Sequence, residues 1–326
     1  MLCKQRIALA LGAAALMLPA LFSGCTKNWD DPILVPPDPP AAYASFTDSA
    51  GETIVLQEKP ERVAVLFSSF AELWQLAGGT VAVTVGESVE RGFVPEGTPL
   101  VDDGAGKKID LERLLVEEPD FVICSGDIAA QAETAETLME LDIPAAQFVV
   151  ESFSDFSDVL KICTDITGDE TAFEQYGAAQ KQAIDTILAE NSFEGVDILF
   201  VRAGSSARSV KAKTSEDHFA AEMLKELGTH NIADDSLLAG AVLSDTLSIE
   251  YILQEDPDYI FFTAMGDEEA SQNFVKEMLQ ESAWQQLTAV RQGNYAFLEK
   301  ELFHFKPNGR WAEAYETLAR LLHTIG

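Results

Sequence analysis

Side chains with metal-binding or nucleophilic chemistry are few in this chain and lie far apart. Direct binding of zinc or manganese needs several histidines and carboxylates that converge on one point. The histidines show no such spacing: they are His218, His230, His304 and His323. Beyond the first 25 residues the cysteines are Cys124 and Cys163, which we expect to be buried free thiols or, alternatively, one disulfide. These residues therefore disfavour a site for a bare metal ion.

The ends of predicted strands carry the residues best suited to holding a ligand. In open α/β sheets, ligands bind beyond the carboxyl ends of the strands, here in the loops after residues 67, 85, 124, 201 and 263. The candidates at these positions are Ser68, Ser69, Phe70, Arg91, Arg202, Ser206 and Met265. Backbone N–H groups at a helix start and arginine guanidinium groups both favour an anionic ligand. The alternatives are helix capping by Ser69 and ion pairs between the two arginines and neighbouring acids.

The elements that would position these residues occur twice. Residues 109–126, IDLERLLVEEPDFVICSG, align with residues 247–264, LSIEYILQEDPDYIFFTA, at a constant offset of 138. Five of the 18 positions are identical, and the apolar pattern agrees as well. Each copy predicts a short amphipathic helix, a Pro-Asp turn and a buried strand. Chance similarity is the alternative, but the repeat favours two similar α/β lobes with a cleft between them.

Strands and helices alternate around the first copy, which predicts a parallel, buried sheet. Ser69 and Glu72 have the spacing of a capping box, so a helix is expected from Ser69 to the glycines at 78–79. The first half predicts an edge hairpin arm near 51–60, strands at 62–67, 81–85, 121–124 and 146–150, a loop at 86–97, and helices at 131–141 and 153–167. The second half predicts strands at 197–202 and 209–212, and helices at 218–227, 271–280 and 311–324.

The longest uninterrupted helical pattern covers residues 169–191. Apolar residues recur there at helical spacing, and Gly177 is the one residue that would weaken the helix. The segment lies midway between the two repeat copies, so we interpret it as the connection between the lobes. The alternative is a helix that belongs to one lobe.

The N-terminus has the pattern of an export signal. Lys4 and Arg6 precede an apolar run, which ends at Ser23-Gly24-Cys25. This ending resembles a bacterial lipobox, in which Cys25 would become the lipidated first residue; the alternative is an ordinary secretory signal cut nearby. The proline-rich residues that follow predict an extended tether.

The chain is strongly acidic, with 22 basic against 54 acidic residues and a net charge of −32. Nucleic-acid binding rests on cationic contacts to phosphate, so this balance argues against a nucleic-acid partner. The acidic balance suits a protein that an anionic membrane surface repels. The alternative for most of these acids is that they simply keep the protein surface hydrated.

Several motifs together resemble one family, the substrate-binding lipoproteins of ABC importers for iron chelates and corrinoids, also called class III or Fe/B12 periplasmic binding proteins. The resemblance covers about residues 45–325. In the first half its motifs are 68–72 (SSFAE), 110–112 (DLE), 118–120 (EPD), 143–144 (IP) and 165–168 (DITG). In the second half they are 247–250 (LSIE), 256–260 (DPDYI) and 284–290 (WQQLTAV).

The resemblance implies an α/β fold of two Rossmann-like lobes with parallel-rich sheets, joined by one long rigid helix that allows little hinge motion. The expected division is a lipoprotein signal at 1–25, a tether at 26–44, an N-terminal lobe at 45–168, a linking helix at 169–191 and a C-terminal lobe at 192–326. It further implies a monomer anchored to the outer face of the cell membrane through lipid on Cys25. Its partners would be an ABC permease dimer and the ATPase of that importer.

Specific roles are also implied by the resemblance. Glu112 and Glu250, at matching repeat positions, would dock to the two halves of the permease, although each alone could be a solvated helix residue. The ligand would be an iron chelate, either a siderophore or haem, with no cofactor and no catalysis. His304 could ligate haem, or pack as a structural residue beside Phe303 and Phe305.

Two other interpretations remain open from the sequence. A corrinoid is the alternative ligand, but corrinoid binders of this family carry aromatic residues in the loop that corresponds to residues 102–106, DDGAG, which has none. From other protein classes, the alternatives are an enzyme resembling a metal chelatase, which would not need an export signal, and a surface adhesion or sensor protein.

Overall fold

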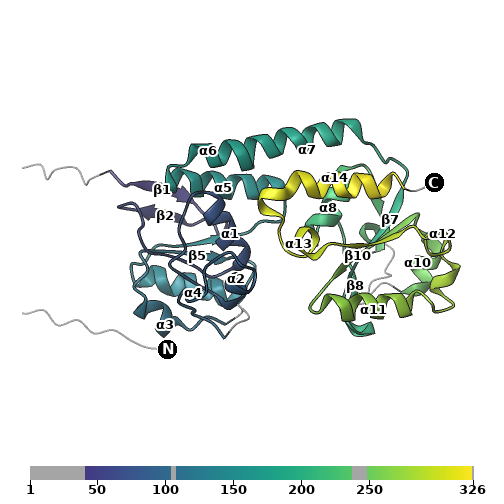
Figure 1. The fold of residues 1–326 in the computed structure, drawn as a ribbon, viewed down its shortest axis with the longest axis horizontal. Helices are drawn as coiled ribbons and strands as arrows, with labels where there is room; N and C mark the ends of the chain where they lie inside the picture. Colours follow the sequence, from purple (N-terminus) through teal and green to yellow (C-terminus); the bar gives the residue numbers. More distant parts are fainter. Residues whose placement is uncertain (1–40, 104–107, 237–247, 325–326) are drawn as a thin grey trace, which may run out of the picture. The chain divides into compact units, whose positions relative to one another are not determined.

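Two larger β-sheets with helices packed on them, and a separate two-stranded hairpin, form the framework of the molecule (Figure 1). The computed structural model describes residues 41–103, 108–236 and 248–324, and both sheets belong to one compact unit that begins at Ala41. The predicted export signal, Cys25 and the tether before residue 41 lie outside the described residues. Within the described ranges, no helix is long and apolar enough to span a membrane.

The N-terminal sheet is parallel throughout, with strand order β4-β3-β5-β6. Every residue of β5 is buried, as expected of a parallel strand that helices cover on both faces. Its strands are β3 (Val63–Val65), β4 (Val83–Thr84), β5 (Phe121–Ser125) and β6 (Ala145–Phe148), and its hairpin is β1 (Ala44–Thr47) with β2 (Thr53–Leu56). Its helices are α1 (Ser68–Leu76), α2 (Gly86–Glu90), α3 (Leu111–Val116), α4 (Ala129–Glu140) and α5 (Phe153–Thr167).

The C-terminal sheet repeats this order as β9-β7-β10-β11, again with parallel pairings. An added antiparallel strand, β8, pairs with the far end of β7. The strands are β7 (Asp197–Ala203), β8 (Val210–Ala212), β9 (His230–Asn231), β10 (Tyr259–Ala264) and β11 (Tyr295–Leu298). The helices are α8 (Phe219–Glu226), α9 (Ile232–Ser236), α10 (Ile249–Glu255), α11 (Glu268–Met278), α12 (Thr288–Gln292), α13 (Lys300–Phe303) and α14 (Trp311–Leu322), with short 3-10 turns η2 (Ala207–Ser209), η3 (Trp284–Gln286) and η4 (Asn308–Arg310).

The two repeat copies form the same turn and are fixed to their sheets in the same way. Asp120 donates its N–H to the carbonyl of Arg62 and accepts the Arg62 N–H on its carboxylate at 2.9 Å. Asp258 makes the same pair of hydrogen bonds with Asp197. The residue two positions before each aspartate has a positive φ, 47° at Glu118 and 44° at Asp256. The repeat therefore has a structural basis, and the predicted α/β fold of two lobes is confirmed.

The connection between the lobes is helical from Glu170 to Glu190. It consists of α6 (Glu170–Phe173), a π-helical turn η1 (Glu174–Ala178) and α7 (Ala179–Glu190). The preceding helix α5 ends at Gly168, whose φ of 85° favours glycine. Helix α7 lies alongside α14 (Figure 1). The chain thus passes from one lobe to the other along this helical segment (Figure 1).

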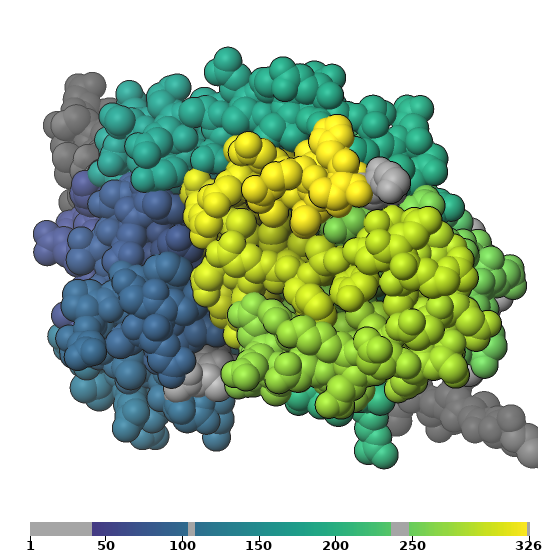
Figure 2. Space-filling model, turned by 45° about the vertical axis from the view of Figure 1, so that its right-hand side comes forward, coloured from purple at the N-terminus to yellow at the C-terminus, as the bar shows by residue number. Residues whose placement is uncertain are grey.

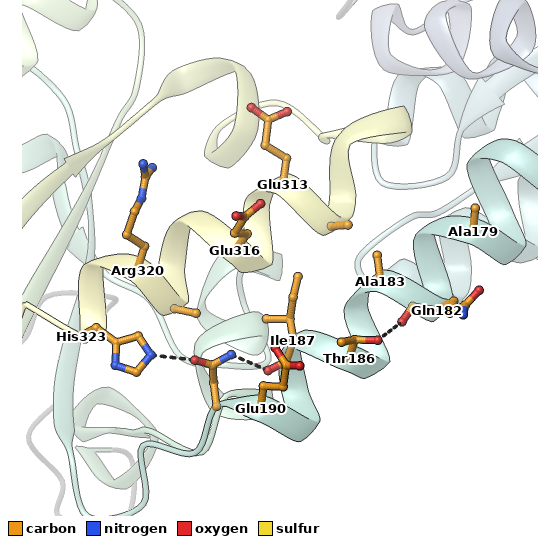
Figure 3. A pocket seen from close by; sticks show the side chains of 13 residues that line it. Ala179, Gln182, Ala183, Thr186, Ile187, Glu190, Glu313, Glu316, Arg320 and His323 are labelled. Atoms are coloured by element: carbon orange, nitrogen blue, oxygen red, sulfur yellow. Dashed lines mark hydrogen bonds between the residues drawn. The ribbon is translucent and has the colours of Figure 1, made fainter.

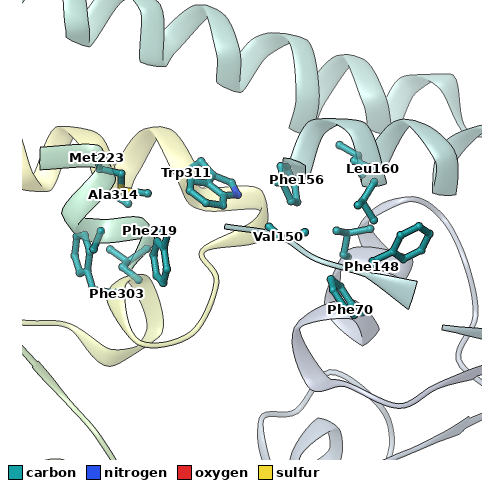
Figure 4. Packing of buried hydrophobic residues seen from close by; sticks show 14 of the residues in the cluster. Phe70, Phe148, Val150, Phe156, Leu160, Phe219, Met223, Phe303, Trp311 and Ala314 are labelled. Carbon is teal, nitrogen blue, oxygen red and sulfur yellow. The ribbon is translucent and has the colours of Figure 1, made fainter. Parts of the chain in front are cut away.

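One hydrophobic core continues through both lobes at this crossing. The Trp311 ring contacts Phe153 and Phe156 of α5 and Phe219 of α8, with ring centroids 5.8–6.1 Å apart. Figure 4 shows the rings of Trp311 and Phe156 between Phe148, on the N-terminal side, and Phe219 with Phe303, on the C-terminal side. We call this group, Trp311 with Phe153, Phe156 and Phe219, the apolar joint. It opposes hinge motion between the lobes, because separation would expose several aromatic rings.

Two local expectations were wrong, and one alternative is resolved. Helix α1 begins at Ser68 with Phe67 as its N-cap and no side-chain cap, so Ser69 and Glu72 form no capping box. The segment 86–97, expected to be a loop, begins with the short helix α2. Cys124 and Cys163 are buried free thiols, which excludes the disulfide. Burial raises the pKa of Cys124 to about 12, so this thiol stays protonated at neutral pH.

Candidate functional site

Arg91, at the end of α2, is the centre of a group of polar and aromatic side chains that come from both lobes. Its Nη1 donates to the hydroxyls of Ser68 and Ser69 at 3.2 and 3.4 Å. Its Nη2 forms an ion pair at 3.3 Å with Glu301, which belongs to the C-terminal lobe. The guanidinium carbon lies 3.8 Å from the ring centroid of Phe305. The side chain is only 9% exposed, so Arg91 is a buried cation between the lobes.

Arg202, the second-last residue of strand β7, is the second cation of this region. Its Nη2 donates to the sulfur of Met265 at 2.9 Å, because β10 pairs with β7 and places Met265 just beyond the strand end. Its Nε atom is buried and, like Nε of Arg91, has no hydrogen-bond partner among the described residues. Buried donors are normally satisfied, so these two guanidinium N–H groups are donors that an oxygen of a ligand could satisfy.

His304 lies close to both arginines. Burial, with Arg202, Lys300 and Arg91 nearby, lowers the pKa of His304 to about 4, so its ring is neutral at pH 7. The ring packs 5.0 Å from that of Phe305. The structure thus brings together the set that we call the interlobe cluster: Ser68, Ser69, Arg91, Arg202, Met265, Glu301, His304 and Phe305.

Two of the predicted ligand residues are placed elsewhere. The side chain of Phe70 is 4% exposed and packs against Phe67 and Phe148 in the core, and its N–H is bonded to the carbonyl of Phe67. Ser206 is exposed and exchanges hydrogen bonds with Ser209 across a 3-10 turn. The helix start at Ser68 therefore supplies hydroxyls to the cluster, with no contribution from the Phe70 ring.

Apart from His304, the sequence did not reveal the contribution of the strap, residues 299–310, which joins β11 to α14. Glu301 pairs with Arg91, Lys306 pairs with Glu151 at 2.8 Å, and Asn308 donates to the carbonyl of Ser69 at 2.9 Å. The yellow part of the chain, which includes this segment, lies against the blue N-terminal lobe in Figure 2. The concentration of aromatic and basic residues in 303–306, FHFK, was a signal that could have found it.

Burial raises the pKa of Glu72, another residue at this boundary, even though Asn308 donates a 2.7 Å hydrogen bond to it. The coulombic effect of Glu301 acts in the same direction as burial, and that of Arg91 opposes it. At this boundary, therefore, burial has a larger effect on the ionisation of the acid than the neighbouring charges.

The two acids expected to dock a partner occupy equivalent positions. Glu112 and Glu250 are each exposed and each is the second residue of a short helix, α3 or α10. The N-cap side chains Asp110 and Ser248 bond the backbone N–H groups of residues 113 and 251, which fixes both helix starts. The two carboxylates therefore lie at the surface on matching elements of the two lobes, and within the described ranges neither forms a hydrogen bond or an ion pair.

A large hollow lies elsewhere, along the seam between α7 and α14 (Figure 3). Its volume is about 810 Å³, and its walls include Ala183, Ile187, Glu316 and Arg320. No residue of the interlobe cluster lines it. It is a groove between two helix faces, without strand ends or buried unpaired donors, so we assign the candidate site to the interlobe cluster.

Two α/β lobes with a cluster of polar residues between them are the architecture of a two-lobe binding protein. Comparison with known proteins agrees with this class. The sequence matches the model of a protein family, described as Periplasmic binding protein, over residues 63–302. The chain therefore belongs to the periplasmic binding protein family, whose members bind substrates for transport and are not enzymes. The alternative of a chelatase-like enzyme is not supported. No curated protein sequence matches the chain.

Solved structures show the same fold. SirA of Staphylococcus aureus, solved with staphyloferrin B, is 17% identical with a TM-score of 0.65, covering 86% of this chain and 98% of that one. The vitamin B12 binding protein BtuF of Vibrio cholerae is 19% identical with a TM-score of 0.65, covering 82% and 98%. The heme-binding protein RhuT from Roseiflexus sp. RS-1 is 17% identical with a TM-score of 0.64, covering 81% and 98%. At these identities the likeness concerns the fold, not the ligand.

Proposed function

We propose that this protein is the extracytoplasmic substrate-binding component of an ABC importer, and that it binds an iron chelate, a siderophore or haem, at the interlobe cluster. The observation that carries the proposal is the pair of buried, unpaired Nε donors of Arg91 and Arg202. A buried donor without a partner costs about 1–3 kcal/mol. Carboxylate or phenolate oxygens of a chelate would satisfy these donors with charge-assisted hydrogen bonds.

The ligand would meet a largely preformed site. The apolar joint and the single helical crossing hold the two lobes in one arrangement, so little conformational entropy remains to be lost on binding. The names of the structural neighbours support the class of ligand, because they include siderophore-, haem- and vitamin B12-binding proteins. The neutral ring of His304 is the group that would ligate haem iron.

Quenching of tryptophan fluorescence would test the ligand directly. Ferric catecholate and hydroxamate complexes, haem and cobalamin would each be titrated into the full chain, whose described tryptophans are Trp74, Trp284 and Trp311. We expect saturable binding of at least one iron chelate or haem, and a Soret shift for haem that His304→Ala abolishes. Binding of cobalamin alone would contradict the proposal.

The role of Arg202 is tested in the same assay. For an anionic chelate, Arg202→Ala should raise the dissociation constant about tenfold or more, since a buried charge-assisted hydrogen bond is worth roughly 1.5–3 kcal/mol. Arg320→Ala is the matched control, because Arg320 is an exposed arginine of α14 that is remote from the cluster. Equal dissociation constants for the Arg202 variant and the unmodified protein would refute this assignment.

Docking to the permease is a separate part of the proposal. The support is the equivalent placement of Glu112 and Glu250, which offers matching carboxylates to a two-fold partner. Glu112→Ala combined with Glu250→Ala should abolish uptake of the chelate by cells and leave ligand binding unchanged. Glu140→Ala with Glu277→Ala changes exposed acids on other helices and should transport normally. Normal uptake by cells that express the variant with both Glu112→Ala and Glu250→Ala would show that these acids do not dock to the permease.

Anchoring through lipid on Cys25 completes the proposal and rests on the N-terminal sequence. Cys25→Ser should release the protein from the membrane fraction, because only the acyl chains would hold so acidic a chain at an anionic surface. Fractionation of cells that express each form measures this, and retention of the serine variant in the membrane would contradict it.

A further inference from the structure

The two arginines of the interlobe cluster have unequal electrostatic environments. Arg91 is ion-paired with Glu301 at 3.3 Å. Arg202 forms no ion pair within the described part of the chain, and its Nη2 faces only the sulfur of Met265, a weak acceptor. One cation is therefore already neutralised by the protein, and the other keeps its full charge for a ligand.

The counter-ion of Arg91 comes from the opposite lobe and is the more accessible partner. The side chain of Glu301 is 52% exposed, whereas that of Arg91 is 9% exposed. Two hydroxyls hold Nη1, so Glu301 takes the remaining Nη end of the guanidinium group. A ligand oxygen that reaches Arg91, at Nε or at Nη2, therefore lies beside a carboxylate.

Of the other basic residues near the cluster, Lys300 keeps its positive charge, whereas Lys306 and His304 contribute none. Lys306 is ion-paired with Glu151 at 2.8 Å. Lys300 donates to the carbonyl of Gly266 at 3.1 Å. His304 is neutral at pH 7 for the reasons given above. The site thus has less net positive charge than its number of basic residues suggests.

We propose that Glu301 is a specificity-determining residue, which neutralises Arg91 and so restricts the site to chelates of low negative charge whose anionic group lies at Arg202. The inference rests on the proposed function and deepens it. A chelate with several negative charges would place one of them against the Glu301 carboxylate, a like-charge contact that weakens its binding. An uncharged or singly charged chelate avoids this repulsion.

The test compares two ferric probes that differ in charge: a triply anionic tris-catecholate and an uncharged trihydroxamate. Glu301→Gln keeps the shape of the side chain and an oxygen that can accept from Arg91, but removes the charge. We expect this variant to bind the tris-catecholate about tenfold more tightly and the trihydroxamate within about twofold of the unmodified protein. The gain should shrink as salt is added, because the pair is partly exposed to solvent.

Glu299→Gln is the matched control, since it removes an exposed acid two residues away that makes no ion pair with Arg91. It should leave the preference between the probes unchanged. If both proteins bind chelates and Glu301→Gln leaves the preference between tris-catecholate and trihydroxamate unchanged, the inference about Glu301 is overturned and the proposed function stands. Absence of binding by every iron chelate and by haem would overturn the proposed function, and this inference with it.

Discussion

The two lobes meet at an apolar joint and at a charged joint. We expect the apolar joint to determine stability and the charged joint to determine ligand specificity. The apolar joint is the group of rings around Trp311, which is 1% exposed. The charged joint consists of the strap contacts: Glu301 with Arg91, Lys306 with Glu151, and Asn308 with Ser69. Both connect the same two lobes, but with different physical forces.

Burial of aromatic surface is strong and barely depends on salt or pH, whereas partly exposed ion pairs contribute about 0–1 kcal/mol and are screened by salt. The apolar joint can therefore hold the lobes together while the charged joint changes its partners. We therefore expect side chains of the strap to rearrange when a ligand binds, and the two sheets to keep their positions.

The largest effect should come from the apolar joint. Trp311→Ala removes a fully buried indole and should lower the free energy of unfolding by about 3–5 kcal/mol. Urea unfolding measures it. Trp311→Phe is the control with a much smaller loss, because it keeps an aromatic ring and removes an Nε1–H that has no partner among the described residues. A loss of less than about 1 kcal/mol in the alanine variant would show that this joint does not hold the lobes.

Acidification should act on His304 of the strap and spare the apolar joint. Burial lowers the pKa of His304 to about 4 in the folded state, below its unfolded value of about 6.5. The stability due to its neutral form is therefore present above pH 6.5 and is lost as the pH falls towards 4. Thermal melts of His304→Gln and the unmodified protein between pH 8 and 4 should show a smaller acid loss in the variant. If the stability of His304→Gln and of the unmodified protein fell equally with acid, the assignment to His304 would be contradicted. Trp311→Ala is the control, and its stability should fall with acid as much as that of the unmodified protein.

The smallest effect should come from a single ion pair of the strap. Lys306→Met removes the partner of Glu151 but keeps an apolar stem over the ring of Phe219, where the ammonium group lies 4.8 Å from the centroid. We expect a loss of no more than about 1 kcal/mol, which falls further in high salt. Lys181→Met, which breaks an exposed pair with Asp185 on α7, provides the comparison outside the joint. A loss above about 2 kcal/mol would make the charged joint a stabilising element.

Much of the fold could be predicted because its signals are local. Helix α5 was expected at 153–167 and is found there, since Ser152 caps its start and Gly168 ends it. The repeat predicted two matching helix-turn-strand units, and the equivalent hydrogen bonds of Asp120 and Asp258 explain why the aspartate occurs in both. These features depend on residues that are near in sequence, or on a pattern that recurs.

The rest depended on partners far apart in the chain. Arg91 and Arg202 were candidates from the sequence, but nothing near them in the sequence indicated that Glu301 would pair with one and leave the other free. The capping box at Ser69 failed because the helix starts one residue earlier, where the hydroxyls turn to Arg91. The role of Trp311 could not be foreseen, because its contacts come from two helices of different lobes.

The continuous core has a consequence for how the molecule comes apart. Because side chains of both lobes share one buried cluster, neither lobe can melt without exposing apolar surface of the other. The two lobes should therefore lose their structure cooperatively, with a single endotherm in a calorimeter instead of one for each lobe.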